Sequence, residues 1–469
     1  MTTVSENPGK IEQHTIFQIP LDQRHGRARD LFTIWFGTNL HMLTIVTGAL
    51  ATTVFKLPFL SSVVAMVIGN LVGAVFMALH AAQGPRLGVP QMVQTRGQFG
   101  SRGAMLVVGI VIVMYVGFLA ANIVLAGKSL HAIAPVLNQD ALLIGVALVT
   151  LVATIFGHDL IHAYARWVTW VSGGALVTAF GWIVFVHGLP PGFLGMGEFT
   201  LAGFCSVLSI SALWQIAYAP YVSDYSRYLP RDTGSEPAFW ASYWGCTLGS
   251  VFPMTLGAML GLIAVGGDVI VGLTTFTGAA AAPIIVILSI SIAGNNAVNL
   301  YCGVLSTITV VQTFAPTWQA GALARTVTAV VLLAVALALA LFSAANFMQD
   351  YTDFMLLLLY VLVPWTAVNL VDYYLVRHGD YDVDSFFAPD GGIYGRYNKA
   401  AIFCYLLGIA IQFPFVDNPL YTGPVARMLS KIDISWIVGL AVVGPLYYLL
   451  VRRTLPAGNR AAAAAGQRA

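Results

Sequence analysis

Three asparagines lie close together in the segment SISIAGNNAVNLYCG (residues 289–303), inside a long apolar run: Asn295, Asn296 and Asn299. In a helix, Asn295 and Asn299 share a face, whereas Asn296 is turned about 100° away. Amides embedded in lipid face the interior of a helix bundle, because lipid cannot satisfy their hydrogen bonds. One such asparagine can simply bridge two helices. Three within five residues favour a site that hydrogen-bonds the polar edge of a flat ligand.

Aromatic rings accompany amides in two other apolar segments. Phe118 and Asn122 are four residues apart in MYVGFLAANIVLAG, so in a helix they project from one face. Trp214, Gln215 and Tyr218 form a second group. Aromatic faces stack on a ring while amides hydrogen-bond its edge, so the pattern favours a planar heterocycle as ligand. Ordinary core roles for Phe118 and Asn122 remain an alternative, and a sugar ligand is also left open.

The composition places these residues in a membrane. The chain has 469 residues, of which 58% are hydrophobic and 9% charged, and its mean hydropathy is +0.80. Soluble proteins carry about a quarter charged residues, so a soluble fold is excluded. The net charge of +2 indicates no nucleic-acid partner. The four cysteines lie in apolar segments without metal-ligand spacing, and we expect neither a disulfide, a metal nor a cofactor.

Twelve apolar stretches are long enough to cross a bilayer, whose core of about 30 Å needs roughly 20 apolar residues per helix. Helices are expected because backbone groups in lipid must be satisfied within the segment. The sequence therefore predicts an all-α polytopic membrane protein. The predicted spans are residues 31–55, 59–82, 104–127, 140–157, 163–188, 201–224, 240–266, 282–305, 322–342, 352–376, 399–416 and 434–451.

The distribution of basic residues predicts the orientation. Of the 22 Lys and Arg residues, all but Lys56, Lys128, Arg427 and Lys431 fall on the side of the N-terminal tail. Cytoplasmic loops are rich in Lys and Arg. We therefore expect both tails, residues 1–30 and 452–469, to be cytoplasmic, with the protein in the plasma (inner) membrane.

Two of the predicted spans carry helix breakers at mid-membrane depth. The first span clusters Gly37, Thr38 and Asn39, and the sixth contains Pro220, which removes a helix hydrogen bond. A kinked helix would be the simplest explanation of each. However, these spans begin two successive five-helix sets, residues 31–188 and 201–376, which two further spans in residues 399–451 follow. Breaks at matching places indicate a transporter with inverted repeats and a site at the membrane midplane.

Three stretches resemble the nucleobase–cation symporter family, in its purine–cytosine permease branch. They are GPRLGVPQMVQTRGQFGSRGA at residues 84–104, SDYSRYLPR at 223–231 and NNAVNLY at 295–301. The resemblance implies a leucine-transporter-type fold, with five-plus-five inverted repeats, helices 1 and 6 broken and two extra C-terminal helices. It also implies a secondary transporter, not an enzyme, that imports a cytosine- or purine-type nucleobase together with a cation by alternating access.

The resemblance also assigns substrate-binding residues to unbroken spans. Phe118 stands where the family usually has Trp, and Asn122 is the amide that follows one turn later. Asn296 and Asn299 correspond to the amides of the eighth span, although Val298 stands where the family often has Pro. Phe keeps a π face at position 118 but lacks the indole N–H donor.

In the two broken spans, the alignment with the family leaves more than one residue as a candidate. In the sixth span the aromatic that closes on the base is open among Trp214, Gln215 and Tyr218. Tyr218 is preferred, because it lies at the same distance before DYSRY as the Trp of fungal relatives. In the first span the unwound segment maps near Gly37–Asn39. The candidates there are Thr38, Asn39 and Thr44.

The identity of the coupling ion is inferred from two positions at which this chain differs from the family. Sodium-coupled relatives place Ser and Thr hydroxyls just before the first amide of the eighth span, where this chain has Ala293 and Gly294. A hard cation needs oxygen ligands, so proton coupling is favoured. The candidate proton carriers are His41 and Asp224. Neutral His41 hydrogen-bonded in the bundle, and Asp224 paired with Arg227 as a structural lock, are the simpler roles.

Other functions fit the sequence less well than a proton-coupled nucleobase transporter. Within transport, the alternative is a sodium-coupled importer of another planar heterocycle, such as a hydantoin, allantoin or a vitamin precursor. A membrane enzyme is disfavoured because no span carries paired carboxylates, a His/Glu metal cluster or a nucleophile triad. A channel is disfavoured because broken helices around an amide–aromatic site suggest binding and occlusion.

Overall fold

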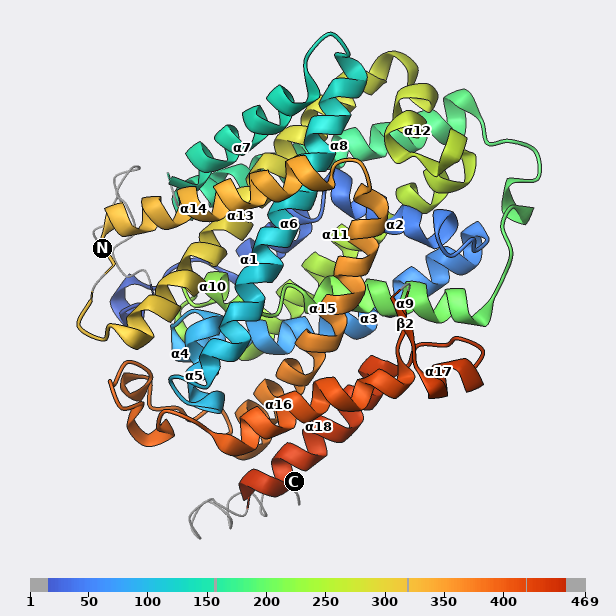
Figure 1. Ribbon diagram of the computed structural model, residues 1–469. Coiled ribbons are helices and arrows are strands. Elements are labelled where there is room, and N and C mark those ends of the chain that lie inside the picture. Colours follow the sequence, from blue (N-terminus) through green and yellow to red (C-terminus); the bar gives the residue numbers. More distant parts are fainter. Residues whose placement is uncertain (1–15, 156–157, 319, 419, 453–469) are drawn as a thin grey trace.

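The computed structural model describes residues 16–155, 158–318, 320–418 and 420–452, and these are mostly helical (Figure 1). The long and broken helices are α1 (Ala28–Thr38), α2 (Met42–Thr53), α3 (Phe59–Ala81), α6 (Ala104–Ile133), α7 (Gln139–Ile155), α8 (His158–Gly181), α9 (Leu201–Ile216), α10 (Val222–Ser226), α11 (Ser235–Ile263), α13 (Ala281–Phe314), α14 (Ala322–Ser343), α15 (Phe347–Leu370), α16 (Lys399–Gln412) and α18 (Ser435–Arg452). Short helices are α4 (Gly84–Leu87), α5 (Gln91–Phe99), α12 (Val269–Phe276) and α17 (Pro424–Met428). Strands β1 (Asp417–Asn418) and β2 (Tyr421–Thr422) pair antiparallel.

Every predicted span coincides with a helix or a helix pair. Among the described residues, 8 helices are long and apolar enough to cross a membrane, or 9 if the bent pair α1–α2 is one span. Three shorter apolar helices, Gln139–Thr154, Leu201–Ile216 and Lys399–Phe415, occupy the remaining predicted spans. The predicted all-α membrane fold is confirmed, and the count of twelve is matched by position although not by helix length.

Both predicted helix breaks are present. The α1 and α2 axes meet at 60°, and the chain between them is Asn39, Leu40 and His41, of which His41 is extended (φ −147°, ψ 170°). The break lies slightly later than predicted, because Gly37 and Thr38 still belong to α1. The second break separates α9 from α10, and Pro220 lies within it. A proline supplies no backbone N–H, so it cannot continue the α9 ladder.

The helices pack in two groups. The first bundle consists of α1, α2, α3, α9 and α11, and the second bundle of α6, α7, α13 and α14 (Figure 1). Helix α8 contacts both, through α1 and α13. Each bundle combines helices from both five-helix sets, so the two broken helices belong to the same bundle. A substrate site formed by the broken helices would therefore lie where the first bundle faces the second.

Glycines spaced four residues apart bring the helices of the first bundle into backbone contact. On α3, a Cβ at Gly69 or Gly73 would overlap carbonyl oxygens of α9, and on α11 a Cβ at Gly245 or Gly249 would press against the backbone of α1. Small residues at this spacing let membrane helices approach closely without a hydrophobic driving force. The broken helices are therefore held against α3 and α11 as one unit.

The two C-terminal helices α16 and α18 pack on each other and on α15, at one end of the molecule (Figure 1). A buried carboxylate ties α18 to the end of α15. Asp372 accepts hydrogen bonds from the hydroxyls of Tyr381 and Tyr447, both at 2.5 Å, and from Arg377 Nε at 3.0 Å. Charge-assisted bonds of this kind are about twice as strong as neutral ones, which fixes the position of the extra pair.

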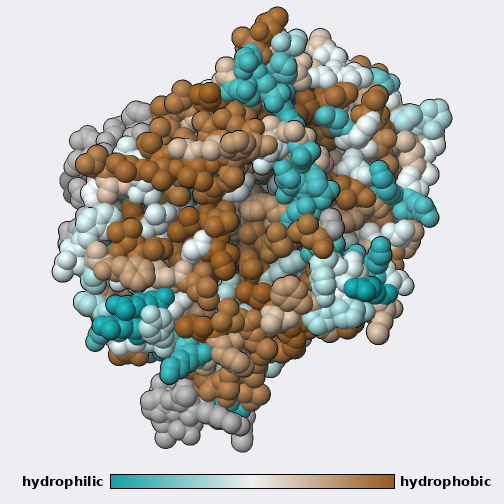
Figure 2. Space-filling model, in the orientation of Figure 1, coloured by the Kyte–Doolittle hydropathy of each residue, from teal (hydrophilic) through white to brown (hydrophobic). Residues whose placement is uncertain are grey.

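Apolar residues cover much of the face shown in Figure 2. Exposed examples are Trp170 at 82%, Phe185 at 85%, Phe342 at 87% and Val113 at 65%. A water-soluble chain rarely exposes such extensive apolar surface. This surface is that of a multi-pass membrane protein.

Candidate functional site

A cavity lined by buried residues lies where the two broken helices face the second bundle. Its empty volume is about 270 Å³, and its lining residues are Leu43, Phe118, Trp214, Ala217, Tyr218, Tyr221, Asn295 and Asn299. None of these residues is more than 8% exposed. Only about 20 Å³ of this space is free to the centre of a water molecule, which is room for about one water, so the lining residues must move apart to admit a ring.

Aromatic rings form two walls of the cavity at right angles. The Phe118 and Trp214 ring centroids are 6.3 Å apart with an interplanar angle of 89°, and Trp214 meets Tyr218 at 6.2 Å and 80°. Behind Phe118, the ring of Phe354 from α15 packs edge-on at 5.2 Å. A flat ligand ring can therefore stack on one wall while its edge meets the other, which is the favourable geometry for aromatic pairs.

The three asparagines of α13 have different surroundings. Asn295 and Asn299 line the cavity, and Asn299 Oδ1 is buried without a hydrogen-bond partner in the described part of the chain. Asn296 is fully buried outside the lining, where its Oδ1 accepts from Asn122 Nδ2 at 2.9 Å. That pair still leaves Asn122 Oδ1 and Asn296 Nδ2 without partners among the described residues. Buried unpaired amide groups are costly, so this corner is suited to a polar ligand.

Asn39 braces the aromatic wall from behind and does not line the cavity. Its Oδ1 accepts from Trp214 Nε1 at 2.7 Å, Tyr218 OH at 2.9 Å and Ser250 Oγ at 2.9 Å, while its Nδ2 donates to the Trp35 carbonyl at 2.7 Å. The sequence suggested that Asn39 contacts the substrate. In the structure its hydrogen-bonding capacity is used within the protein, so it positions the rings that face the ligand.

The register of the sixth span is decided by the rotation of α9. Trp214 and Tyr218 line the cavity, whereas Gln215 points away, with its Nε2 donating to Asn70 Oδ1 of α3 at 2.6 Å. Gln215 therefore joins helices of the first bundle and does not line the site. The other candidates from the first span are also buried outside the lining: Thr38 and Thr44.

The break between α1 and α2 is tied to α13 by two contacts. Ser291 Oγ donates to the Leu40 carbonyl at 2.8 Å, and His41 Nε2 lies 3.3 Å from the side-chain amide of Asn295. His41 is fully buried and caps α2, because its Nδ1 accepts from the Leu43 N–H at 3.3 Å. His41 is thus adjacent to a cavity-lining residue without lining the cavity itself.

Asp224 lies at the second break and contacts α5. Its carboxylate accepts from the Gln91 backbone N–H at 2.9 Å, in the first turn of α5, where a negative charge is favoured by the helix dipole. Arg227 Nε donates to the backbone carbonyl of Asp224 at 3.3 Å. These contacts fit a structural lock between α10 and α5, and Asp224 is not among the residues that line the cavity.

Sequence reasoning missed three residues of the lining, Leu43, Ala217 and Tyr221. Tyr221 packs against Tyr218 with centroids 5.6 Å apart. It lies three residues after Tyr218, in the non-helical turn between α9 and α10. The spacing of Tyr218 and Tyr221 could have indicated that both line the cavity. However, assigning residues to one face by helical periodicity fails where the helix is broken.

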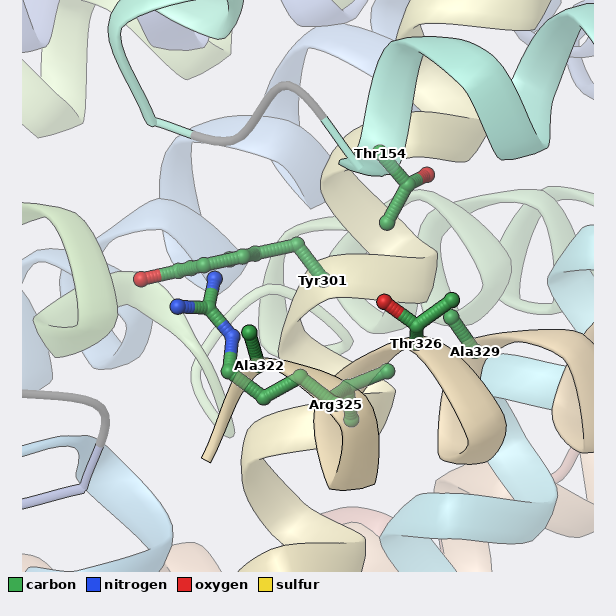
Figure 3. Close-up of a pocket in the computed structure, with 7 residues that line it drawn as sticks. Thr154, Tyr301, Ala322, Arg325, Thr326 and Ala329 are labelled. Atoms are coloured by element: carbon green, nitrogen blue, oxygen red, sulfur yellow. The ribbon is translucent and has the colours of Figure 1, made fainter. Parts of the chain in front are cut away.

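A second, larger cavity has an empty volume of about 390 Å³ (Figure 3). In Figure 3 the Tyr301 ring lies beside the Arg325 guanidinium. Within the described part of the chain, the lining comes from α7, α13 and α14: Thr154, Tyr301, Val304, Ala322, Arg325, Thr326 and Ala329. Neither broken helix contributes to it, so the smaller cavity between the two bundles is the better candidate for a transport site.

Comparisons with known proteins agree with this architecture. The profile of the family described as "Permease for cytosine/purines, uracil, thiamine, allantoin" matches residues 18–439. The chain is 40% identical over 457 residues to YxlA of Bacillus subtilis, which is assigned by name to the purine–cytosine permeases, covering 95% of this chain and 97% of that protein. It is 24% identical over 464 residues to the purine–cytosine permease fcyB of Emericella nidulans, covering 94% and 88% of the two chains.

Solved transporters share the fold at low sequence identity. The structure of Mhp1, a nucleobase-cation-symport-1 family transporter, in a closed conformation with bromovinylhydantoin bound, superposes with a TM-score of 0.76 at 16% identity, over 95% of this chain and 97% of that one. A Na⁺-coupled sialic acid symporter gives a TM-score of 0.62 at 14% identity, over 91% and 89%. Fold and family agree: the chain belongs to the family of permeases for cytosine/purines, uracil, thiamine and allantoin, and it is a membrane transporter, not an enzyme.

Proposed function

We propose that this protein imports a nucleobase, or a planar heterocycle of similar size, by proton symport and alternating access. The observation that carries the proposal is the cavity between the two bundles, where perpendicular aromatic rings meet the amides of α13. Stacking would hold the ring, while Asn295 and Asn299 would hydrogen-bond its edge. Family membership and the purine–cytosine permease names of the relatives point to the same substrate class.

The proposed orientation places both termini in the cytoplasm, with the protein in the plasma (inner) membrane. The excess of Lys and Arg on the side of the N-terminal tail supports this. We further propose that residues 31–188 and 201–376 are the two repeats that move relative to each other, and that residues 399–451 form the appended helix pair. The matched breaks at the first helix of each repeat support this division.

Proton coupling is supported by the corner between the first break and α13. Ala293 and Gly294 offer no side-chain oxygen to a cation, and the neighbouring Ser291 hydroxyl already donates to the Leu40 carbonyl. Among the described residues, the His41 ring contacts the Leu43 N–H, the Asn295 amide and the Trp214 ring, none of which is charged. A proton added at His41 Nδ1 would remove the acceptor that caps α2, and losing a cap costs about 0.5–2 kcal/mol. Protonation would thereby act directly on the break.

The driving ion can be tested by uptake of radiolabelled cytosine, uracil and hypoxanthine into proteoliposomes. We expect uptake to follow an inward proton gradient and to collapse with a protonophore, whether or not sodium is present. Full uptake driven by a sodium gradient at equal pH on both sides would overturn proton coupling. That outcome would favour the alternative, a sodium-coupled importer of a planar heterocycle.

Stacking on Phe118 gives a second measurable expectation. Phe118→Ala should raise the apparent KM about tenfold or more, because stacking of a base on an aromatic ring is worth roughly 1–3 kcal/mol. Phe118→Trp should be tolerated, since it keeps the π face. The matched control is Phe252→Ala on α11, where the ring packs against Phe180 and does not line the cavity. An unchanged KM in Phe118→Ala would remove this ring from the site.

A further inference from the structure

The side-chain amide of Asn295 joins the cavity lining to the titratable ring of His41. Asn295 lines the cavity, and His41 Nε2 lies 3.3 Å from its Nδ2. An asparagine amide has a donor end and an acceptor end, which exchange when the group turns by 180°. Which end faces the ligand therefore depends on what His41 presents.

The other ring nitrogen fixes the tautomer of His41. Its Nδ1 accepts a hydrogen bond from the Leu43 backbone N–H at 3.3 Å, as the cap of α2. A nitrogen that accepts carries no proton, so a neutral imidazole in this position must carry its proton on Nε2. His41 therefore presents an N–H donor to Asn295.

A donor at Nε2 requires an acceptor opposite to it. With Asn295 Nδ2 opposite, two N–H groups would face each other, whereas turning the amide by 180° brings Oδ1 to His41 and satisfies both groups. The oxygen and nitrogen of an amide are assigned by such hydrogen-bonding arguments. In this arrangement the NH₂ group of Asn295, a residue of the cavity lining, points away from His41.

The His41 ring has little freedom to undo this arrangement. It is 0% exposed, and the Trp214 ring lies against it with centroids 6.3 Å apart. The adjacent Leu40 carbonyl is tied to α13 by Ser291. By contrast, no described hydrogen bond holds the Asn299 amide, whose Oδ1 is unpaired. Of the two asparagines that line the cavity, Asn295 is thus held in one orientation, whereas no described hydrogen bond fixes the orientation of Asn299.

We infer that His41 is a positioning residue that holds the Asn295 NH₂ group toward the cavity, so that the site selects rings with a hydrogen-bond acceptor at that edge. Suitable acceptors are an exocyclic carbonyl oxygen or an unprotonated ring nitrogen. This inference rests on the proposed function and narrows its substrate class. It does not depend on which ion drives transport.

The test compares the affinities of oxo bases and their thio analogues for the purified full-length protein. The probe pairs are uracil with 4-thiouracil and hypoxanthine with 6-mercaptopurine, because a thiocarbonyl sulfur is a weaker acceptor than a carbonyl oxygen. We expect the wild type to prefer one oxo base over its thio analogue by about tenfold, the size of one lost hydrogen bond. His41→Ser keeps a capping oxygen for α2 but cannot reach Asn295, so this preference should fall to about twofold or less.

Two further variants distinguish a loss of the Asn295 orientation from a general loss of folding or affinity. Ser291→Ala removes the neighbouring tether but not the His41 contact, so it should leave the oxo/thio ratio unchanged even if both affinities fall. Asn295→Asp keeps an acceptor for His41 but has no NH₂ group, so it should weaken binding of the oxo base about tenfold. This second variant also tests the inference if His41→Ser does not fold.

The outcomes distinguish the inference from the proposed function. If the wild type binds oxo bases but His41→Ser keeps the full oxo/thio ratio, or Asn295→Asp binds the oxo base normally, the positioning role is wrong and base transport stands. If no base binds the wild type at all, the proposed function fails and this inference fails with it.

Discussion

Replacing Asn39 with alanine is expected to lower the thermal stability of the protein strongly and to abolish uptake. The substitution removes the oxygen that accepts from Trp214 Nε1 and Tyr218 OH, both buried. Each orphaned donor costs about 1–3 kcal/mol, so two of them cost several times the effect of an ordinary surface substitution. Loss of this acceptor also frees the two rings that line the cavity, so binding and the link between the two broken helices should fail together.

A hydroxyl on the same broken span provides the control. Thr44 is fully buried, and its Oγ1 has no hydrogen-bond partner among the described residues. Thr44→Val keeps the shape of the side chain and should leave both stability and uptake close to wild type. Melting temperatures of the purified variants and initial uptake rates in proteoliposomes measure both effects. If Asn39→Ala were as stable and as active as Thr44→Val, Asn39 would not be the residue that holds the Trp214 and Tyr218 rings in place.

The second large effect is expected for the amides of α13. Asn299→Ala should raise the apparent KM about tenfold or more, because Asn299 lines the cavity with its Oδ1 unpaired among the described residues, and one lost hydrogen bond to a ligand costs about 1–3 kcal/mol. Asn296→Ala should also abolish or strongly weaken uptake, although by another route. It leaves Asn122 without its partner at 2.9 Å and loosens the contact between α6 and α13 behind the cavity wall.

Transport assays on variants that reach the membrane in normal amounts check this expectation. Thr307→Ala is the matched control, because Thr307 lies on the same helix and its hydroxyl donates only to the Gly303 carbonyl one turn earlier, at 2.8 Å. Near-normal uptake in both asparagine variants would mean that these amides only join helices.

Several features of the site were predictable because they depend on local sequence. Asn295 and Asn299 share a helix face by their spacing alone, and both line the cavity while Asn296 does not. Pro220 and the cluster after Gly37 marked the two breaks, because backbone hydrogen bonding is lost wherever a proline or a flexible segment interrupts a helix.

Other features could not be derived in this way. Neither Gln215 nor Asn39 lines the cavity, since Gln215 bonds Asn70 and Asn39 bonds the ring donors of α9. Nothing in the local sequence distinguishes an amide that faces a ligand from one that satisfies a neighbouring helix. The Gly-x-x-x-Gly spacings at Gly69 and Gly245 are typical of close helix packing, but they do not indicate that Gly69 meets α9 and Gly245 meets α1.

The sequence alone determined the membrane class, the positions of the spans and the sites of breakage. The physical reason is that lipid forces each segment to be apolar and internally hydrogen-bonded, which is a property of that segment. Only the tertiary structure decided which side chains converge. The rotation of α9 and the pairing of α6 with α13 depend on contacts between segments far apart in the chain, such as Asn122 with Asn296 and His41 with Asn295. Those contacts set which polar groups remain unpaired, and therefore which of them are left to bind a substrate.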